Sequence, residues 1–199
     1  IALALDILGD RWTLLILRDL MSGLQRYGDI LESCDGLSPN LLSSRLKRLE
    51  AEGLVERHYF KELPPRVEYT LTGKGRAVRP VLISLIEWAN QFIAPTTAEA
   101  LGQAITTDFA VRVVPTFAFD PRRAHGLNAT MTIEIGECEG CNSWTFQIQD
   151  GCLFPSRHAH VGADVHLRTD AQGFFRFIRG EAPAAECGEL LGDPALAAC

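Results

Sequence analysis

Three patterns in the sequence predict an α+β fold in two domains, residues 1–94 and 95–199. Before residue 54, apolar residues recur at helical spacing, and residues 54–71 then alternate like the two strands of a β-hairpin. Beyond a compact hinge at 94–97, alternating segments predict a second domain that is rich in strands and ends in a helix. The 199 residues, 47% of them apolar, are ordinary for a globular protein.

The first 33 residues predict three helices. Gly9 and Asp10 interrupt the first helical pattern, and Asp10 can cap the next helix, which we expect at residues 11–21. Its apolar side chains face a core, and we expect Arg18 and Asp19 to lie outside. A short amphipathic helix follows at residues 27–33.

Residues 38–52 predict the helix around which this domain is organised. Ser38 can accept hydrogen bonds from the first amides, Pro39 suits the first helical position, and Gly53 suits the position after the end. Leucines form one apolar stripe along it, and the opposite face has no acidic residue. That polar face consists of Asn40, Ser44, Lys47 and Ala51, flanked by Ser43 and Arg48.

A basic β-hairpin follows this helix directly, with a turn at residues 61–65. A polar, basic helix followed by a hairpin with a basic tip is typical of a winged helix-turn-helix. In that fold the helix enters the DNA major groove and the hairpin, or wing, contacts the backbone. We therefore expect double-stranded DNA as a partner. The expected contacts are Ser38, Asn40, Ser43, Ser44, Lys47 and Arg48 on the helix, and Arg57, Lys61 and Arg66 on the wing.

Within the helix, Lys47 and Asn40 are the expected base readers because they lie opposite the apolar stripe. Arg45 lies nearer the stripe, so we expect it to brace the fold through an acidic residue or to contact a phosphate.

The charge distribution supports this interpretation although the whole chain has a net charge of −6. Residues 1–95 contain 3 Lys and 9 Arg against 5 Asp and 7 Glu, so they are neutral. Residues 40–79 contain 9 basic and 5 acidic residues, which places positive charge where DNA is expected. The acidity lies in residues 96–199, which contain 7 Arg and no Lys against 6 Asp and 7 Glu.

The first half of the chain resembles a known family. The stretches that show this are ALDILGDRWTLLILRDL, RYGDI, LSPNLLSSRLKRLEAEGLVER, PPRVEYTLTGKGR and PVLISLIEWA. In combination they are similar to the HxlR-type winged-helix transcriptional regulators, relatives of the MarR group, over residues 1–93. The resemblance implies a DNA-binding regulator and supports a dimer.

Residues 72–92 predict a long helix that begins at Thr72 as the N-cap. So much apolar surface at the end of a domain predicts a partner, and a two-fold homodimer suits an operator with two half-sites. The alternative is that this helix packs only on its own C-terminal domain. The expected dimer contacts are Val81, Leu85, Trp88 and Phe92.

In the second domain, residues 99–118 are compatible with strand or helix, and we favour a helix kinked near Pro115. Strands are expected at residues 128–135, 143–149, 151–156 and 164–168, with a hairpin turn at Asp150-Gly151 and a helix from Asp170.

The motifs DVHLRTD, FFRFIRGE and LLGDPAL resemble the sterol-carrier-protein-2 type of domain. This resemblance implies a sheet backed by helices around an apolar tunnel. We therefore expect a small hydrophobic effector, neutral or weakly charged. The alternative for the phenylalanines is simple core packing. The expected pocket residues are Met131, Ile133, Trp144, Phe146, Phe174, Phe177 and Ile178.

Cysteine spacing leaves three interpretations open. Cys138-x2-Cys141, with Cys152 downstream, is compatible with half of a zinc site, a thiol redox pair or inert thiols. Only one CxxC is present, so we expect no metal. Cys34, before the DNA-reading helix, is compatible with an oxidation sensor or with a small apolar filler.

The sequence contains no GxSxG, Walker-type loop, HExxH or paired-carboxylate motif, so we expect neither enzyme activity nor a cofactor. No run of about 18 apolar residues predicts a membrane span, and we expect a cytoplasmic protein. Because the chain begins with Ile1 inside an expected helix, we expect a preceding segment.

Together these patterns predict a dimeric transcriptional regulator that responds to a small hydrophobic ligand. The alternative is a lipid or hydrophobic-ligand carrier whose winged helix mediates only protein association.

Overall fold

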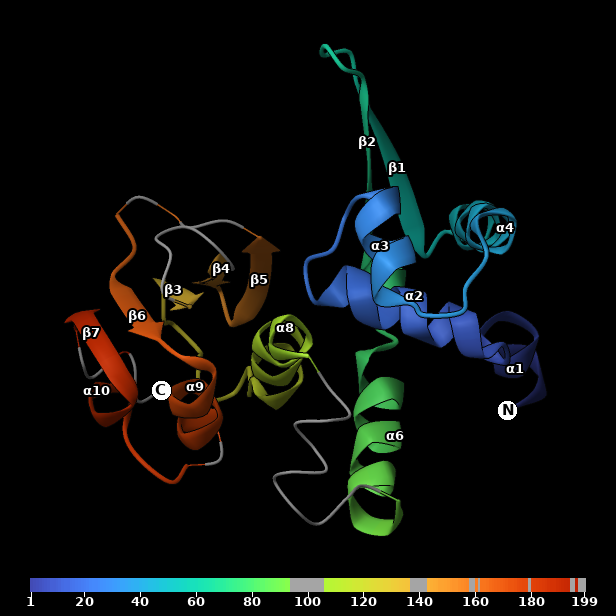
Figure 1. Ribbon diagram of the computed structural model, residues 1–199. Coiled ribbons are helices and arrows are strands. Elements are labelled where there is room, and N and C mark those ends of the chain that lie inside the picture. Colours follow the sequence, from blue (N-terminus) through green and yellow to red (C-terminus); the bar gives the residue numbers. More distant parts are fainter. Residues whose placement is uncertain are drawn as a thin grey trace. The chain divides into compact units, whose positions relative to one another are not determined.

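The computed structural model describes residues 1–93, 106–136, 143–157, 160, 162–178, 180–193 and 196 (Figure 1). The chain divides into two compact units, residues 1–103 and 104–199. The boundary expected at residues 94 and 95 lies nine residues before this division, among residues outside the described ranges. Each unit is described by itself.

The first unit consists of helices and one β-hairpin. Its elements are α1 (Ala2–Leu8), α2 (Arg11–Met21), α3 (Tyr27–Ser33), α4 (Pro39–Ala51), β1 (Val55–Phe60), β2 (Arg66–Leu71), α5 (Gly73–Arg76) and α6 (Arg79–Phe92). The strands β1 and β2 pair antiparallel from Val55 opposite Leu71 to Phe60 opposite Arg66. The predicted helices up to residue 51 and the predicted hairpin are therefore confirmed.

The core of this unit is built from leucine and isoleucine side chains of α2, α3 and α4. Ile16 and Leu17 of α2, Ile30 of α3 and Leu42 of α4 are completely buried. The leucine stripe expected on α4 therefore faces the core, and the polar face is left outside.

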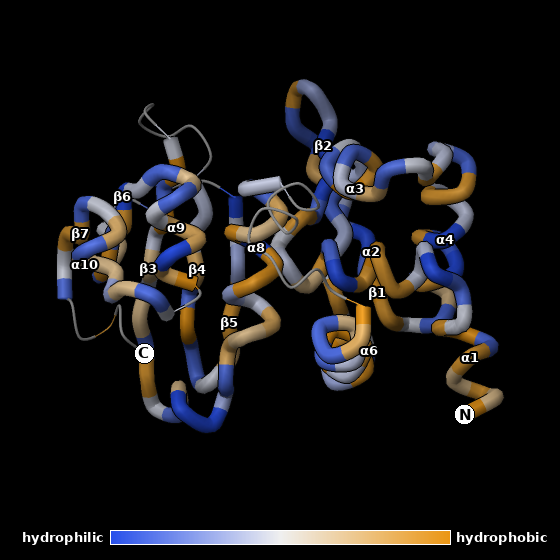
Figure 2. Tube along the Cα trace, turned by 60° about the horizontal axis from the view of Figure 1, so that its bottom comes forward, coloured by the Kyte–Doolittle hydropathy of each residue, from blue (hydrophilic) through white to orange (hydrophobic). Residues whose placement is uncertain are grey.

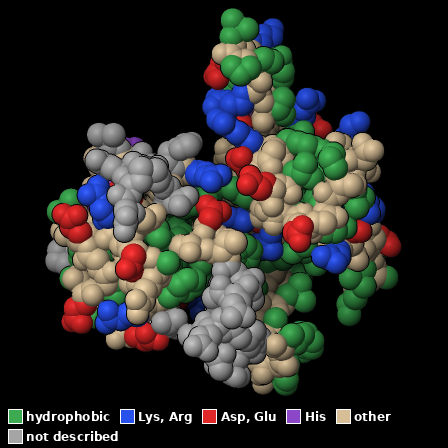
Figure 3. Space-filling model, viewed as in Figure 1, with side chains coloured by type: hydrophobic (Ala, Val, Ile, Leu, Met, Phe, Trp, Pro, Cys, Tyr) green, Lys and Arg blue, Asp and Glu red, His purple; other side chains and the backbone are tan. Residues whose placement is uncertain are grey.

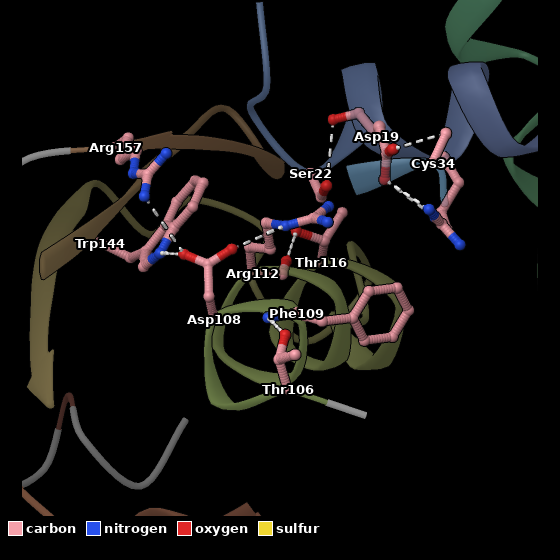
Figure 4. Close-up of polar contacts among 11 residues, drawn as sticks. Asp19, Ser22, Cys34, Thr106, Asp108, Phe109, Arg112, Thr116, Trp144 and Arg157 are labelled. Carbon is pink, nitrogen blue, oxygen red and sulfur yellow. Dashed lines mark hydrogen bonds and ion pairs between the residues drawn. The ribbon is translucent and has the colours of Figure 1, made fainter. Parts of the chain in front are cut away.

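The prediction that Arg18 and Asp19 lie outside is wrong. The Asp19 side chain is completely buried, and that of Arg18 is only 17% exposed. Figure 4 shows how the cost of burying the Asp19 carboxylate is offset. Arg18 forms an ion pair with it at 2.8 Å, and the Cys34 thiol donates to it at 3.3 Å. Arg18, which precedes Asp19 in α2, and Cys34, which follows α3, thus allow the Asp19 carboxylate to be buried.

The single helix expected from Thr72 to Phe92 is also corrected, because the structure has two helices there. The Thr72 hydroxyl accepts from the Gly75 amide at the start of α5, which ends at Arg76. A continuous helix would need the amide of residue 80 to donate to the Arg76 carbonyl, and Pro80 has no amide hydrogen. The chain therefore starts a new helix at Arg79, where a proline in the first turn is tolerated.

The second unit is a five-stranded sheet with helices on one face. Its elements are α8 (Thr107–Ala118), β3 (Ala129–Ile135), β4 (Ser143–Gln149), β5 (Cys152–Arg157), β6 (Val165–Thr169), α9 (Ala171–Ile178), α10 (Ala184–Cys187) and β7 (Gly188–Gly192). The strand order is β5-β4-β3-β6-β7. The strands β3 and β6 pair parallel, and the other neighbours pair antiparallel.

Most predicted elements of this unit are present. The four expected strands occur within one residue of their expected bounds. Of the helix favoured at residues 99–118, residues 107–118 form α8 with Pro115 inside it, and residues 99–105 lie outside the described residues. Asp150 and Gly151 both have positive φ, as a tight hairpin turn between β4 and β5 requires. The strand β7 was not predicted.

The sheet has one apolar and one polar face. Met131, Ile133, Trp144 and Phe146 lie on one face, since their strands pair in that register, and this is the face that α8 and α9 cover. On the opposite face the hydroxyls of Thr132 and Thr145 lie 3.1 Å apart.

Candidate nucleic-acid interface

The start of α4 is fixed by the residues that the sequence indicated. The Ser38 hydroxyl accepts from the Leu41 amide at 3.3 Å, and Pro39 occupies the first helical position. Leu46 and Leu49 are each only 2% exposed, so burial sets which way the helix faces. Because the Ser38 hydroxyl serves as the cap, its part in DNA binding remains a prediction.

The polar face of α4 is exposed as predicted from the leucine spacing. The side chains of Asn40, Ser44 and Lys47 all lie on the solvent side. None of the three has a hydrogen bond or an ion pair to any other residue that the structure describes. These groups are therefore available for base edges or phosphates.

Two flanking residues of this face make contacts inside the unit. The Ser43 hydroxyl lies 3.2 Å from the Tyr27 hydroxyl, which also donates to the Pro39 carbonyl at 2.6 Å. The Arg48 guanidinium donates to the backbone carbonyl of Asp6 in α1. Tyr27 therefore ties α3 to the first turn of α4. No role was predicted for Tyr27 from the sequence, although it stands in the RYGDI stretch.

Arg45 braces the fold. Its Nη2 and Nε donate to the two carboxylate oxygens of Asp10 at 2.9 and 3.2 Å, so α4 is attached to the start of α2. The same carboxylate caps α2 by accepting from the amides of Trp12 and Thr13 at 3.0 and 3.3 Å. Of the two roles expected for Arg45, the contacts show the one through an acidic residue.

These contacts change the acidity of Asp10. Partial burial by itself raises the pKa of this carboxyl group. The hydrogen bond from Arg45, the amide of Thr13, the Arg45 charge and the amide of Trp12 outweigh that effect, so the pKa lies below its ordinary value of 3.8. Asp10 is therefore ionised in the folded protein near neutral pH.

The wing presents some of its basic residues and engages others. Arg57 and Lys61 are exposed, and neither has a partner among the residues that the structure describes. Arg66 is only 33% exposed and forms ion pairs with Glu62 and Glu68 at 3.3 and 3.4 Å. Figure 3 shows Lys and Arg side chains along the hairpin and hydrophobic ones at its end.

The expected dimer residues form an exposed apolar stripe on α6. Val81, Leu85, Trp88 and Phe92 are 45%, 47%, 55% and 64% exposed. The rings of Trp88 and Phe92 lie 5.9 Å apart, and Figure 2 shows hydrophobic and hydrophilic residues on different sides of this helix. Four large apolar side chains in one row on a helix are typical of a contact surface.

The residues expected to line a ligand pocket lie on the helix-covered face of the second sheet or on α9. Trp144 and Phe174 are completely buried, and Met131 and Phe177 pack against the core around Val165. The Trp144 indole donates to Asp108 of α8 at 3.1 Å, and Figure 4 shows Arg112 and Arg157 pointing toward the same carboxylate. The two arginines lie 3.4 and 3.9 Å from it. The pocket itself remains a prediction.

The structure describes only some of the cysteines for which the sequence suggested a role. Cys138 and Cys141 lie outside the described residues, while Cys152 is an exposed free thiol on β5. Within the described residues, no group of three His, Cys, Asp or Glu side chains is placed to hold a metal ion. Cys34 is 3% exposed and hydrogen-bonded to Asp19, which limits the access of an oxidant.

Among the described residues, no helix is long and apolar enough to cross a membrane.

Comparison with known proteins identifies the first unit. Residues 7–97 match the HxlR-like helix-turn-helix family. The uncharacterized HTH-type transcriptional regulator YvaP of Bacillus subtilis is 45% identical over 93 residues, which cover 47% of this chain and 86% of YvaP. The HTH-type transcriptional regulator YodB of the same organism is 42% identical over 92 residues, covering 46% of this chain and 82% of YodB.

A solved structure, the reduced form of YodB from B. subtilis, is 41% identical and covers 47% of this chain and 92% of its own, with a TM-score of 0.42. The matches to the family, to YvaP and to YodB each cover less than half of this chain, so the sterol-carrier resemblance of the second unit remains a prediction. They cover most of the relatives, which are HTH-type transcriptional regulators. The chain therefore belongs to the HxlR-like helix-turn-helix family.

Proposed function

We propose that this protein is a sequence-specific transcriptional regulator that reads DNA with α4 and contacts the DNA backbone with its wing. The observation that supports this most directly is the acid-free face of α4, where Asn40, Ser44 and Lys47 are exposed without partners among the described residues. An amide side chain can read adenine and an amine can read guanine in the major groove. Arg57 and Lys61, which are exposed on the wing and have no partner among the described residues, suit phosphates.

The regulator acts as a homodimer through α6 in this proposal. The stripe from Val81 to Phe92 is too apolar and too exposed for a helix that faces only water. A two-fold dimer presents two copies of α4 to successive major grooves, about 34 Å apart along the DNA. The expected operator is therefore a pair of inverted half-sites.

The second unit binds a small effector in this proposal. Residues 96–199 contain no Lys and have 13 acidic against 7 basic residues, which disfavours an anionic ligand or a second nucleic-acid site. The apolar side chains between the sheet and α9 suit a neutral or weakly charged hydrophobic molecule. An effector that releases DNA must bind the DNA-bound protein more weakly by the same factor, since the coupling is reciprocal.

The test is a binding titration of the whole protein with DNA from upstream of its own gene, followed by fluorescence anisotropy at several salt concentrations. Lys47→Ala is the informative variant, and Lys74→Ala is the matched control. Lys74 has the same charge but lies on α5 and donates to the Glu52 carbonyl at 2.6 Å. We expect Lys47→Ala to reduce the preference for the operator over unrelated DNA and Lys74→Ala to leave it unchanged. Equal preference in both variants would contradict the assignment of α4.

A further inference from the structure

An acidic residue lies at the centre of the basic wing. Glu68 is in the middle of β2, and its side chain is only 17% exposed although the hairpin projects into solvent. An acid next to a DNA-binding surface repels phosphates, so on electrostatic grounds alone it weakens binding. Glu68 nevertheless lies in the wing that carries Arg57 and Lys61, and its contacts indicate another role.

Glu68 joins two segments that are far apart in the chain. One carboxylate oxygen, Oε1, lies 3.9 Å from Nε of Arg26, which immediately precedes α3, and 3.4 Å from Nε of Arg66 in the wing. The backbone at the same place is also paired, since Arg26 and Glu68 form a β-bridge and the Tyr69 amide donates to the Gln25 carbonyl at 2.8 Å. Glu68 therefore lies where the wing attaches to the helices.

The Arg66 guanidinium is held by contacts within the wing. Its guanidinium stacks 4.4 Å over the Phe60 ring and also lies 3.3 Å from Glu62. Its Nε is buried from solvent and has no hydrogen-bond partner among the described residues, so the Glu68 carboxylate is the charge that compensates it. An arginine held by two carboxylates and an aromatic ring is poorly placed to contact a phosphate at the same time.

We propose that Glu68 is a positioning residue for DNA binding. It holds the wing against the start of α3 by bridging Arg26 and Arg66, so that Arg57 and Lys61 reach the phosphates of the DNA backbone. Single surface ion pairs contribute little, but here one largely covered carboxylate serves two arginines beside a paired backbone. Removing its charge leaves Arg26 without this ion pair and Arg66 with Glu62 as its remaining carboxylate, which loosens the contact between the wing and the start of α3. The proposal rests on the proposed DNA-binding function and assigns Arg66 to the wing instead of to a phosphate.

Glu68→Gln tests the proposal because the two explanations predict opposite signs. If Glu68 only repels DNA, the neutral variant binds the operator more tightly. If Glu68 positions the wing, we expect binding about tenfold weaker, together with a salt slope that is smaller by about 1 to 2, because up to two phosphate contacts are lost. Glu56→Gln is the matched control, since Glu56 is 64% exposed on β1 and its one ion pair among the described residues is with His58. It should bind as tightly as the wild type or slightly more tightly.

Arg66→Lys separates positioning from a direct phosphate contact. Lysine keeps the charge but lacks the planar group that stacks on Phe60 and reaches two carboxylates. We expect Arg66→Lys to weaken binding as much as Glu68→Gln does, and the double variant to be no weaker than either single variant. Additive losses, or full binding by Arg66→Lys, would overturn the proposal.

Thermal unfolding of each variant checks that the unit stays folded, and unchanged unfolding with weakened binding is the expected result. If Glu68→Gln lowered the free energy of unfolding by as much as it lowered the free energy of DNA binding, Glu68 would be only a structural residue and the proposal would fail. Failure of the proposed function looks different, because then the wild type itself shows no preference for the operator at any salt concentration.

Discussion

Asp10 gives the sharpest test of how α4 is held. Its carboxylate accepts two amides at the start of α2 and binds Arg45 of α4 through two hydrogen bonds. Losing an N-cap of this type costs about 1 kcal/mol. The Asp10 and Arg45 side chains are 32% and 22% exposed, so solvent screening limits their ion pair to about 0.5–1 kcal/mol.

Asp10→Ala should therefore lower the free energy of unfolding by about 1.5–2 kcal/mol. For a unit of about 100 residues this corresponds to a fall of roughly 6–16 °C in the unfolding temperature. Asp10→Asn keeps an oxygen for the cap and loses the charge, so it should cost only about 0.5–1 kcal/mol. The measurement is thermal unfolding followed by circular dichroism.

The control is Asp35→Ala, which removes an exposed aspartate that has no partner among the described residues. It should change stability by less than about 0.5 kcal/mol. A double-mutant cycle of Asp10→Ala with Arg45→Met should give a coupling of about 0.5–1 kcal/mol. Purely additive losses from Asp10→Ala and Arg45→Met would refute the bracing contact.

The same residue predicts a dependence on pH. The pKa of Asp10 in the folded protein lies below 3.8, so the ionised carboxylate contributes stability at every pH above that ordinary value. The contribution is lost as the pH falls through the lowered pKa. The stability difference between the wild type and Asp10→Asn should therefore be constant near neutral pH and shrink below pH 3.8. A difference that persisted unchanged under acid would show that the charge is not its source.

Three further predictions concern binding and assembly. Asn40→Ala should lose about 1–3 kcal/mol of discrimination at one base pair, whereas Lys61→Ala should weaken all sequences about equally and reduce the salt slope by about 1. Leu85→Glu should convert a dimer into a monomer in sedimentation, because the interface would bury an unpaired charge, while Asn90→Glu on the opposite, exposed side of α6 should not. A dimeric Leu85→Glu protein would disprove this use of α6. Deleting residues 104–199 should leave operator binding measurable but insensitive to hydrophobic small molecules, and a truncated protein that still responds would assign the effector site elsewhere.

The sequence by itself determined the local elements of this protein. The bounds of α4 follow from the Ser38 cap, the proline after it and the leucine spacing, all of which act within a few residues. The wing and the Asp150-Gly151 hairpin follow from alternation and turn chemistry in the same way. The break before α6 also has a local cause, because Pro80 has no amide hydrogen to donate within a continuous helix, although the apolar spacing by itself predicts a single helix.

Only the tertiary structure decided which polar residues are engaged inside the protein. Asp19 looks like a surface residue from its spacing, yet Cys34 and Arg18 make its complete burial possible. The parallel pairing of β3 with β6 and the edge strand β7 likewise join segments that no local pattern connects.

The basic residues show the same division. The sequence placed Lys47, Arg48 and Arg66 together in one DNA-binding set, whereas the structure ties Arg48 to α1 and Arg66 to Glu62 and Glu68. The reason is physical: a cap or a turn is satisfied by neighbours in the chain, but a buried or paired charge is satisfied by whatever the fold brings beside it.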